Sequence, residues 1–112
     1  MPDPILPGMP QPLQQVPLPD LSGTPKQVAW ALDIRARLYP AALKAQDQRM
    51  RLLEVWTERG DVRPEKIADL RAQLAAGVDS LARLEKETSA HAWIANRDLE
   101  PLELLAGKWR ED

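Results

Sequence analysis

The sequence contains no cysteine, no phenylalanine and a single histidine, His91. Without cysteine the chain can form neither a disulfide nor a thiolate metal site, and cysteine nucleophiles are excluded. A lone histidine without a partner at metal-ligand spacing is a poor metal ligand, so we expect no metal and no cofactor. The five glycines are scattered and form no phosphate-binding loop. We therefore predict that the protein is not an enzyme.

Long apolar runs are also missing. No stretch could cross a bilayer, and the start of the chain lacks the basic and apolar regions of a secretory signal. With the lack of cysteine, this favours a cytoplasmic protein that uses no membrane. The formal net charge is −2, whereas general nucleic-acid binders usually carry a strong positive excess. A length of 112 residues suits one small domain.

Proline is concentrated at the start of the chain, where most of the 11 prolines lie within residues 1–19. Proline fixes φ and removes a backbone donor, so we predict an extended, polyproline-II-like arm over residues 1–23. The arm is either a solvated tail or a strap that packs on its own helices or in a partner's groove. We favour packing, because large apolar side chains alternate with the prolines. The predicted partner-binding side chains are Ile5, Leu6, Met9, Leu13, Val16 and Leu18.

The rest of the chain, residues 24–112, has the apolar spacing of α-helices and predicts an all-α bundle of four to five helices. Its first helix starts with a capping box, Thr24 to Gln27, that has proline at the first helical position. Pro40 is expected to end or kink this helix near Leu38, because proline lacks the N–H that continues the hydrogen-bond ladder.

The second helix is predicted over about 41–59, with Gly60 as its stop and Pro64 as the start of the third. Two short helices are predicted over 90–96, capped by Ser89, and over about 101–110. The third helix carries the most regular apolar stripe, formed by Ile67, Leu70, Leu74, Val78, Leu81 and Leu84. Gly77 within it predicts either a close helix crossing or a break.

The four tryptophans are candidates for the core or for a binding surface. Trp30 and Trp56 lie on or beside apolar stripes, and we predict that both are in the core. Trp93 sits in a short apolar helix and is also predicted to be buried. Trp109 lies close to the end of the chain and is a candidate partner anchor, since tryptophan is enriched at binding hot spots. The alternative is that the last segment docks Trp109 on its own bundle.

A basic helix face is the second candidate surface. The candidate nucleic-acid-binding side chains are Arg35, Arg37, Lys44, Arg49 and Arg51. Three of them are seven residues apart, so a continuous helix would align them along phosphates, whereas a kink at Pro40 would spoil the alignment. The alternative is an ordinary solvated face, with Asp47 and Glu54 as local partners of these cations.

Two segments resemble motifs of a known group of proteins. The first, TPKQVAWALDIR from Thr24, resembles (S/T)xKQ(I/V)xWAxxIR, and the second, SAHAWIANR from Ser89, resembles SAKxWIxNR. His91 stands where lysine is usual and Ala95 where aspartate is usual. The two motifs occur together in small uncharacterised bacterial proteins that are often associated with phages and mobile elements.

The resemblance implies that the two tryptophan-bearing segments pack together, with Asn96 and Arg97 bonding near the start of the first helix. It also implies a role as an inhibitor of a host-defence complex of the CRISPR type. Independently of it, the lack of catalytic groups and the apolar arm predict a protein that binds a protein partner. The alternatives are a nucleic-acid-binding accessory protein and a structural subunit of a larger assembly.

Overall fold

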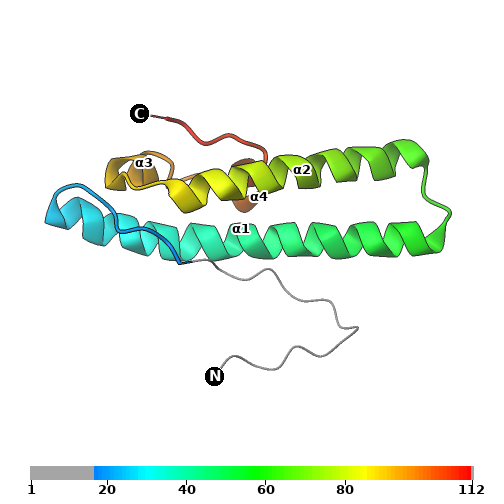
Figure 1. Cartoon of the computed structure of the whole chain (residues 1–112), viewed down its shortest axis with the longest axis horizontal. Coiled ribbons are helices and arrows are strands. Elements are labelled where there is room, and N and C mark those ends of the chain that lie inside the picture. The colour runs from blue at the N-terminus through cyan, green and yellow to red at the C-terminus, as the bar shows by residue number, and fades with distance from the viewer. Residues whose placement is uncertain (1–16, 112) are drawn as a thin grey trace, which may run out of the picture.

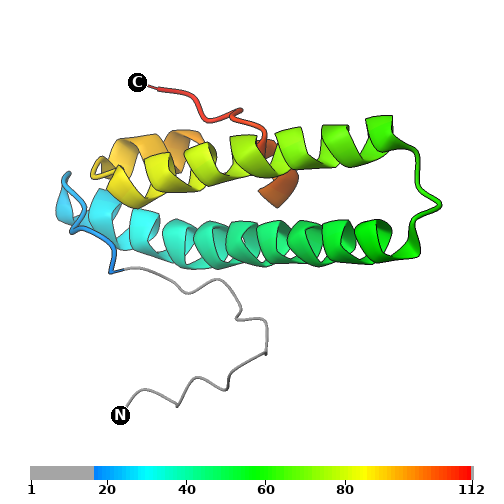
Figure 2. The same ribbon diagram turned by 45° about the vertical axis from the view of Figure 1, so that its right-hand side comes forward.

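The computed structural model describes residues 17–111, and within them the chain forms four helices and no strand. The helices are α1 (Pro25–Arg59), α2 (Pro64–Lys86), α3 (Ala90–Ala95) and α4 (Pro101–Leu105). α1 and α2 lie side by side as a long antiparallel hairpin (Figure 1, Figure 2). α3 packs on α1 near the start of that helix, and α4 contacts both long helices. The prediction of an all-α fold is confirmed.

The helix boundaries that have a local signal lie where they were predicted. Thr24 accepts a hydrogen bond on Oγ1 from the backbone N–H of Gln27 (3.2 Å), and the Gln27 side chain accepts one from the backbone N–H of Thr24 (3.1 Å). Gly60 ends α1 with φ of 72°, a left-handed conformation that glycine adopts without strain. Pro64 is the first residue of α2, and Ser89 caps α3 with its hydroxyl.

Pro40 was predicted to end or kink the first helix near Leu38, and the prediction of an end there is wrong. α1 continues through Pro40, and the helix predicted over 41–59 is its second half (Figure 2). Pro40 has no N–H to donate to the carbonyl group four residues earlier. Buried side chains on both sides of it, including Tyr39 and Ala42, pack into the same core, and this packing stabilises the helix across the missing bond.

α2 is continuous through Gly77, which marks a close crossing with α1 rather than a break. A β-carbon at Gly77 would lie 2.1 Å from Oε1 of Gln46. Gln46 is buried, and its Nε2 donates to the carbonyl oxygen of Leu74 at 2.9 Å. The predicted stripe on α2 is therefore wrong at Val78, which is 60% exposed because Gly77 takes the inward position beside it.

The core lies at the end of the hairpin where the short helices cover it. Its largest fully buried side chains are Trp93, Tyr39, Leu84, Leu104 and Leu105, together with the polar Gln46 and Asn96. Beyond Gln46 no residue of α1 is buried, and α2 buries only Leu70 before Gly77. Trp56, which was predicted to be in the core, is only partly buried in this uncovered half of the hairpin.

Residues 17–22 pack against the helices before α1 begins. The backbone N–H of Ser22 donates to the carbonyl oxygen of Thr88 in the α2–α3 link, and the carbonyl oxygen of Ser22 accepts from Ala90, the first residue of α3. Nη1 of Arg35 donates to the carbonyl oxygen of Pro19 at 2.7 Å. Leu18 packs against the core. Since Ser22 lies near the start of α3 and Pro19 lies beside Arg35, this strap runs antiparallel to α1.

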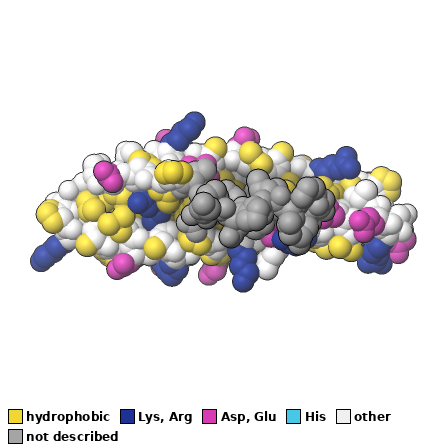
Figure 3. Space-filling model, turned by 60° about the horizontal axis from the view of Figure 1, so that its bottom comes forward, with side chains coloured by type: hydrophobic (Ala, Val, Ile, Leu, Met, Phe, Trp, Pro, Cys, Tyr) yellow, Lys and Arg dark blue, Asp and Glu magenta, His cyan; other side chains and the backbone are white. Residues whose placement is uncertain are grey.

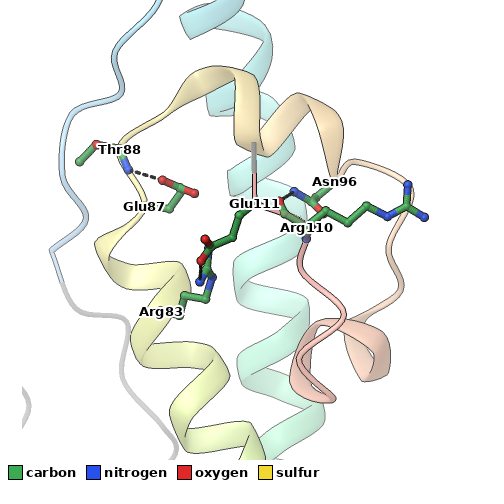
Figure 4. A network of polar contacts seen from close by, with 6 residues as sticks. All are labelled: Arg83, Glu87, Thr88, Asn96, Arg110 and Glu111. Carbon is green, nitrogen blue, oxygen red and sulfur yellow. Dashed lines mark hydrogen bonds and ion pairs between the residues drawn. The ribbon is translucent and has the colours of Figure 1, made fainter.

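The last helix is shorter than the predicted 101–110. α4 ends at Leu105, and Gly107 turns the chain with φ of 78°. The Asn96 side chain then holds the returning segment, since it donates to the carbonyl oxygen of Arg110 (2.9 Å) and accepts from its N–H (2.8 Å) (Figure 4). Asn96 is 14 residues from Arg110 in the sequence, so local spacing could not reveal this pairing and overestimated the length of the last helix.

Candidate functional site

Trp30 is the one tryptophan of the described residues with a half-exposed ring, at 50% of its surface. The guanidinium carbon of Arg97 lies 5.3 Å from the ring centroid, which is within cation–π distance. Arg97 is held in place because its Nη1 donates to the carbonyl oxygen of Ile94 at 2.8 Å. The prediction that Trp30 is in the core is wrong, because the neighbouring Ala31 occupies the inward position and is fully buried.

Three further cations lie on the same side of α1 as this ring. The lysines and arginine that share its exposed side of α1, at helical spacing, are Lys26, Arg37 and Lys44. Within four residues of Arg37, Lys44 or Arg97 in the sequence lie four carboxylates, Asp33, Asp47, Asp98 and Glu100, and the whole chain carries a net charge of −2. Figure 3 shows hydrophobic side chains gathered over the part of the molecule where α1 begins, with lysine and arginine among them. We call Trp30, Arg97 and these three cations the Trp30 face.

The continuous α1 aligns part of the predicted basic stripe. Exposed on one side of the helix at intervals of seven are Arg37, Lys44 and Arg51. Arg35 and Arg49 are partly buried, and Arg35 is bonded to the strap. The five predicted cations therefore do not form one patch. Asp47 accepts a hydrogen bond from Arg51 at 2.9 Å, and this bond together with the carboxylate charge raises the pKa of the Arg51 guanidinium.

The predicted binding side chains of the arm divide into two groups. Outside the described residues lie Ile5, Leu6, Met9, Leu13 and Val16. Leu18 is described, and it packs against the protein's own core instead of being presented to a partner. For Leu18, the structure supports the alternative in which the arm packs on the protein's own helices.

Trp109 is placed on the protein's own bundle. Its ring meets Trp93 edge to face, with the ring centroids 4.9 Å apart and the planes inclined by 72°. The segment around it is held by the Asn96 side chain and by an ion pair between Arg83 and Glu111 (Figure 4). Trp109 is thus a partly buried core contact, and the prediction of an exposed anchor at this position is corrected. The prediction that Trp93 is buried is confirmed.

The two motif-bearing segments lie next to each other. Arg97 stacks on Trp30, and Nη2 of Arg37 donates to the carbonyl oxygen of Arg97 at 3.2 Å. Arg97 thus contacts the first part of α1 by stacking on Trp30 and is hydrogen-bonded further along the helix, at Arg37, whereas Asn96 bonds to Arg110 in the C-terminal segment and not to α1. Sequence spacing could not predict that Arg97 stacks on Trp30, because the two residues are 67 positions apart and share no local periodic pattern.

Two further findings bear on the chemistry of the described part of the chain. Among residues 17–111, no three histidine, aspartate or glutamate side chains are grouped so that they could hold a metal ion. None of the helices described combines the length and the hydropathy needed to span a bilayer.

Comparisons with protein families, with curated proteins and with solved structures find no match for the chain. The resemblance to phage and mobile-element proteins, and the host-defence role that it implies, remain predictions.

Proposed function

We propose that the protein is a non-catalytic interaction protein whose Trp30 face binds an acidic surface of a protein partner. The observation that supports this proposal is the half-exposed Trp30 ring with the Arg97 guanidinium stacked on it. Tryptophan and arginine are the residues most enriched at interface hot spots, where a rigid ring fills a pocket of the partner. Arg97 is already held by Ile94, so little conformational entropy is lost when the partner binds.

The acidic character of the partner is inferred from charge. The cations of the Trp30 face are Lys26, Arg37, Lys44 and Arg97. Complementary charge speeds association and selects among partners. An apolar ring with one cation stacked on it and further cations along the same side of α1 suits a peptide or protein surface in which carboxylates flank an apolar side chain.

Selection from a random displayed peptide library tests the proposal and does not require the partner to be identified first. We expect the wild-type chain to enrich peptides rich in Asp and Glu. Trp30→Ala and Arg97→Ala should each weaken binding of the enriched peptides, by roughly 30-fold for Trp30→Ala, which corresponds to a hot-spot loss of ~2 kcal/mol.

Val55→Ala is the matched control, because Val55 is also half-exposed on α1, at 49%, but lies in the uncovered half of the hairpin. This variant should bind the peptides like the wild type, and circular dichroism should show all three variants folded. Enrichment without an acidic bias, or equal binding by Trp30→Ala and the wild type, would reject the proposal.

Nucleic-acid binding is the second candidate function, and the observation that favours it is the alignment of Arg37, Lys44 and Arg51 on one exposed side of α1. Binding to phosphates would weaken steeply as salt rises. Fluorescence anisotropy with labelled single-stranded and duplex oligonucleotides at low salt tests it. Salt-sensitive binding that falls in Lys44→Ala would support this function, whereas no binding at low salt would eliminate it.

A further inference from the structure

An apolar groove opens between the two long helices. Its volume is about 310 Å³. The apolar side chains that line it are Leu43 and Met50 from α1, and Val78, Leu81 and Ala82 from α2. Val78 is 60% exposed and Met50 40% exposed, so two large apolar side chains face solvent here without cover from any described residue. We call this surface the α1–α2 groove.

The strap formed by residues 17–22 leads toward this groove. Arg35, which holds the carbonyl group of Pro19, is followed at intervals of four residues by Tyr39 and Leu43, so that one row of side chains connects the strap to the groove. Halfway along the row, the Tyr39 hydroxyl donates to Glu85 at 2.6 Å, and Glu85 also lines the groove. The strap and the groove therefore share one side of the hairpin.

The length of chain before the strap is sufficient to fill the groove. Leu43 and Met50 lie eight and 15 residues beyond Arg35, or about 12 and 22 Å along the helix axis. An arm in the polyproline-II conformation advances ~3.1 Å per residue, so about four to seven residues before Pro19 cover that distance. Those residues include Val16 and Leu13, whose apolar side chains match the groove.

The chemistry of the segment also fits. Residues 4–16 carry no charge, so their docking would bury no ion against the apolar surface. Gln14 and Gln15 lie between the apolar Leu13 and Val16 in the sequence, so their amides are expected to face solvent. We infer that residues 1–16 of this chain dock in the α1–α2 groove, with Leu13 and Val16 covering Met50 and Val78. This inference stands apart from the proposed function, since none of these residues belongs to the Trp30 face.

Methyl NMR of the full chain at low concentration tests the inference. Nuclear Overhauser effects are expected between the methyl groups of Leu13 and Val16 and those of Met50 and Val78. In Val78→Glu the docked population should fall by about tenfold or more, because a carboxylate would have to be covered by apolar side chains without a partner. The Leu13 and Val16 signals should then move to their positions in a free peptide of residues 1–16.

Val55→Glu is the matched control, since it places the same charge on a comparably exposed valine of the hairpin. It should keep the Overhauser effects of the wild type. Three outcomes would overturn the inference. The effects could be absent in the wild type, they could persist in Val78→Glu, or they could arise between labelled and unlabelled chains in a mixed sample, which would identify a second copy as the occupant.

Discussion

Gly77 and Gln46 meet where α1 crosses α2, and the packing there leaves no room for a β-carbon. The amide of Gln46 is buried, with one hydrogen bond to Leu74 and with Oε1 unpaired among the described residues. Displacing this amide would break that bond inside the protein, where a lost hydrogen bond is poorly replaced by water. At the scale of single residues, this contact explains the close approach of the two helices.

Gly77→Ala should therefore destabilise the protein, although alanine normally favours a helix. The new β-carbon would meet Oε1 of Gln46 at 2.1 Å. We expect the free energy of unfolding to fall by about 1–3 kcal/mol, as for other overpacked core positions. Urea denaturation followed by circular dichroism measures the change.

The matched background for this measurement is Gln46→Ala, which removes the obstructing amide. In that background the same Gly77→Ala substitution should raise the free energy of unfolding, by up to about 1 kcal/mol, through helix propensity. A Gly77→Ala protein as stable as the wild type would show that Gln46 moves aside freely and would contradict this account of the crossing.

At the scale of elements, α1 contains a proline that interrupts its hydrogen bonding but not its path. Pro40→Ala restores the backbone N–H, and the gain in helix propensity exceeds the loss of proline's restraint on the unfolded chain. The free energy of unfolding should rise by about 1–2 kcal/mol in thermal or urea denaturation. Pro25→Ala is the control and should not stabilise, because proline is already preorganised for the first helical position. A less stable Pro40→Ala protein would mean that the ring itself is needed in the core.

The elements that could be predicted are those with a local cause. Four helix ends are set by a residue at that end and one or two groups next to it. These residues are Thr24, Gly60, Pro64 and Ser89. The helix end predicted at Pro40 was wrong because the local effect of proline is overridden by the packing of residues far apart in the sequence. At the end of α4, the pairing of Asn96 with the returning chain could not be anticipated from local spacing either.

The candidate site was harder to predict than the fold. The predicted cations Arg37 and Lys44 do lie on the Trp30 face, because helical spacing alone places them there. Spacing led us to predict a buried Trp30. Whether Trp30 or its neighbour Ala31 turns inward depends on how α1 is rotated against α2 and α3, which local spacing does not determine. The partner of the ring, Arg97, comes from another part of the chain.

At the scale of the whole molecule, the described chain has a covered half and an uncovered half. α3, α4 and the strap bury the hairpin at the end where α1 begins, and the Trp30 face lies on the outside of that half. The other half consists of two helices with little buried surface. A binding surface placed on the well-packed half is held rigidly, which keeps Trp30 and Arg97 in position before a partner arrives.

The four indole N–H signals of the protein provide the most direct test that the Trp30 face is the binding surface. In a ¹H–¹⁵N titration with an acidic peptide enriched from the displayed library, the account predicts that the Trp30 indole signal moves in proportion to the bound fraction. The indole signals of Trp56, Trp93 and Trp109 should stay in place, because those rings lie outside the Trp30 face. A Trp30 signal that stays unmoved while the peptide saturates the protein would contradict the account.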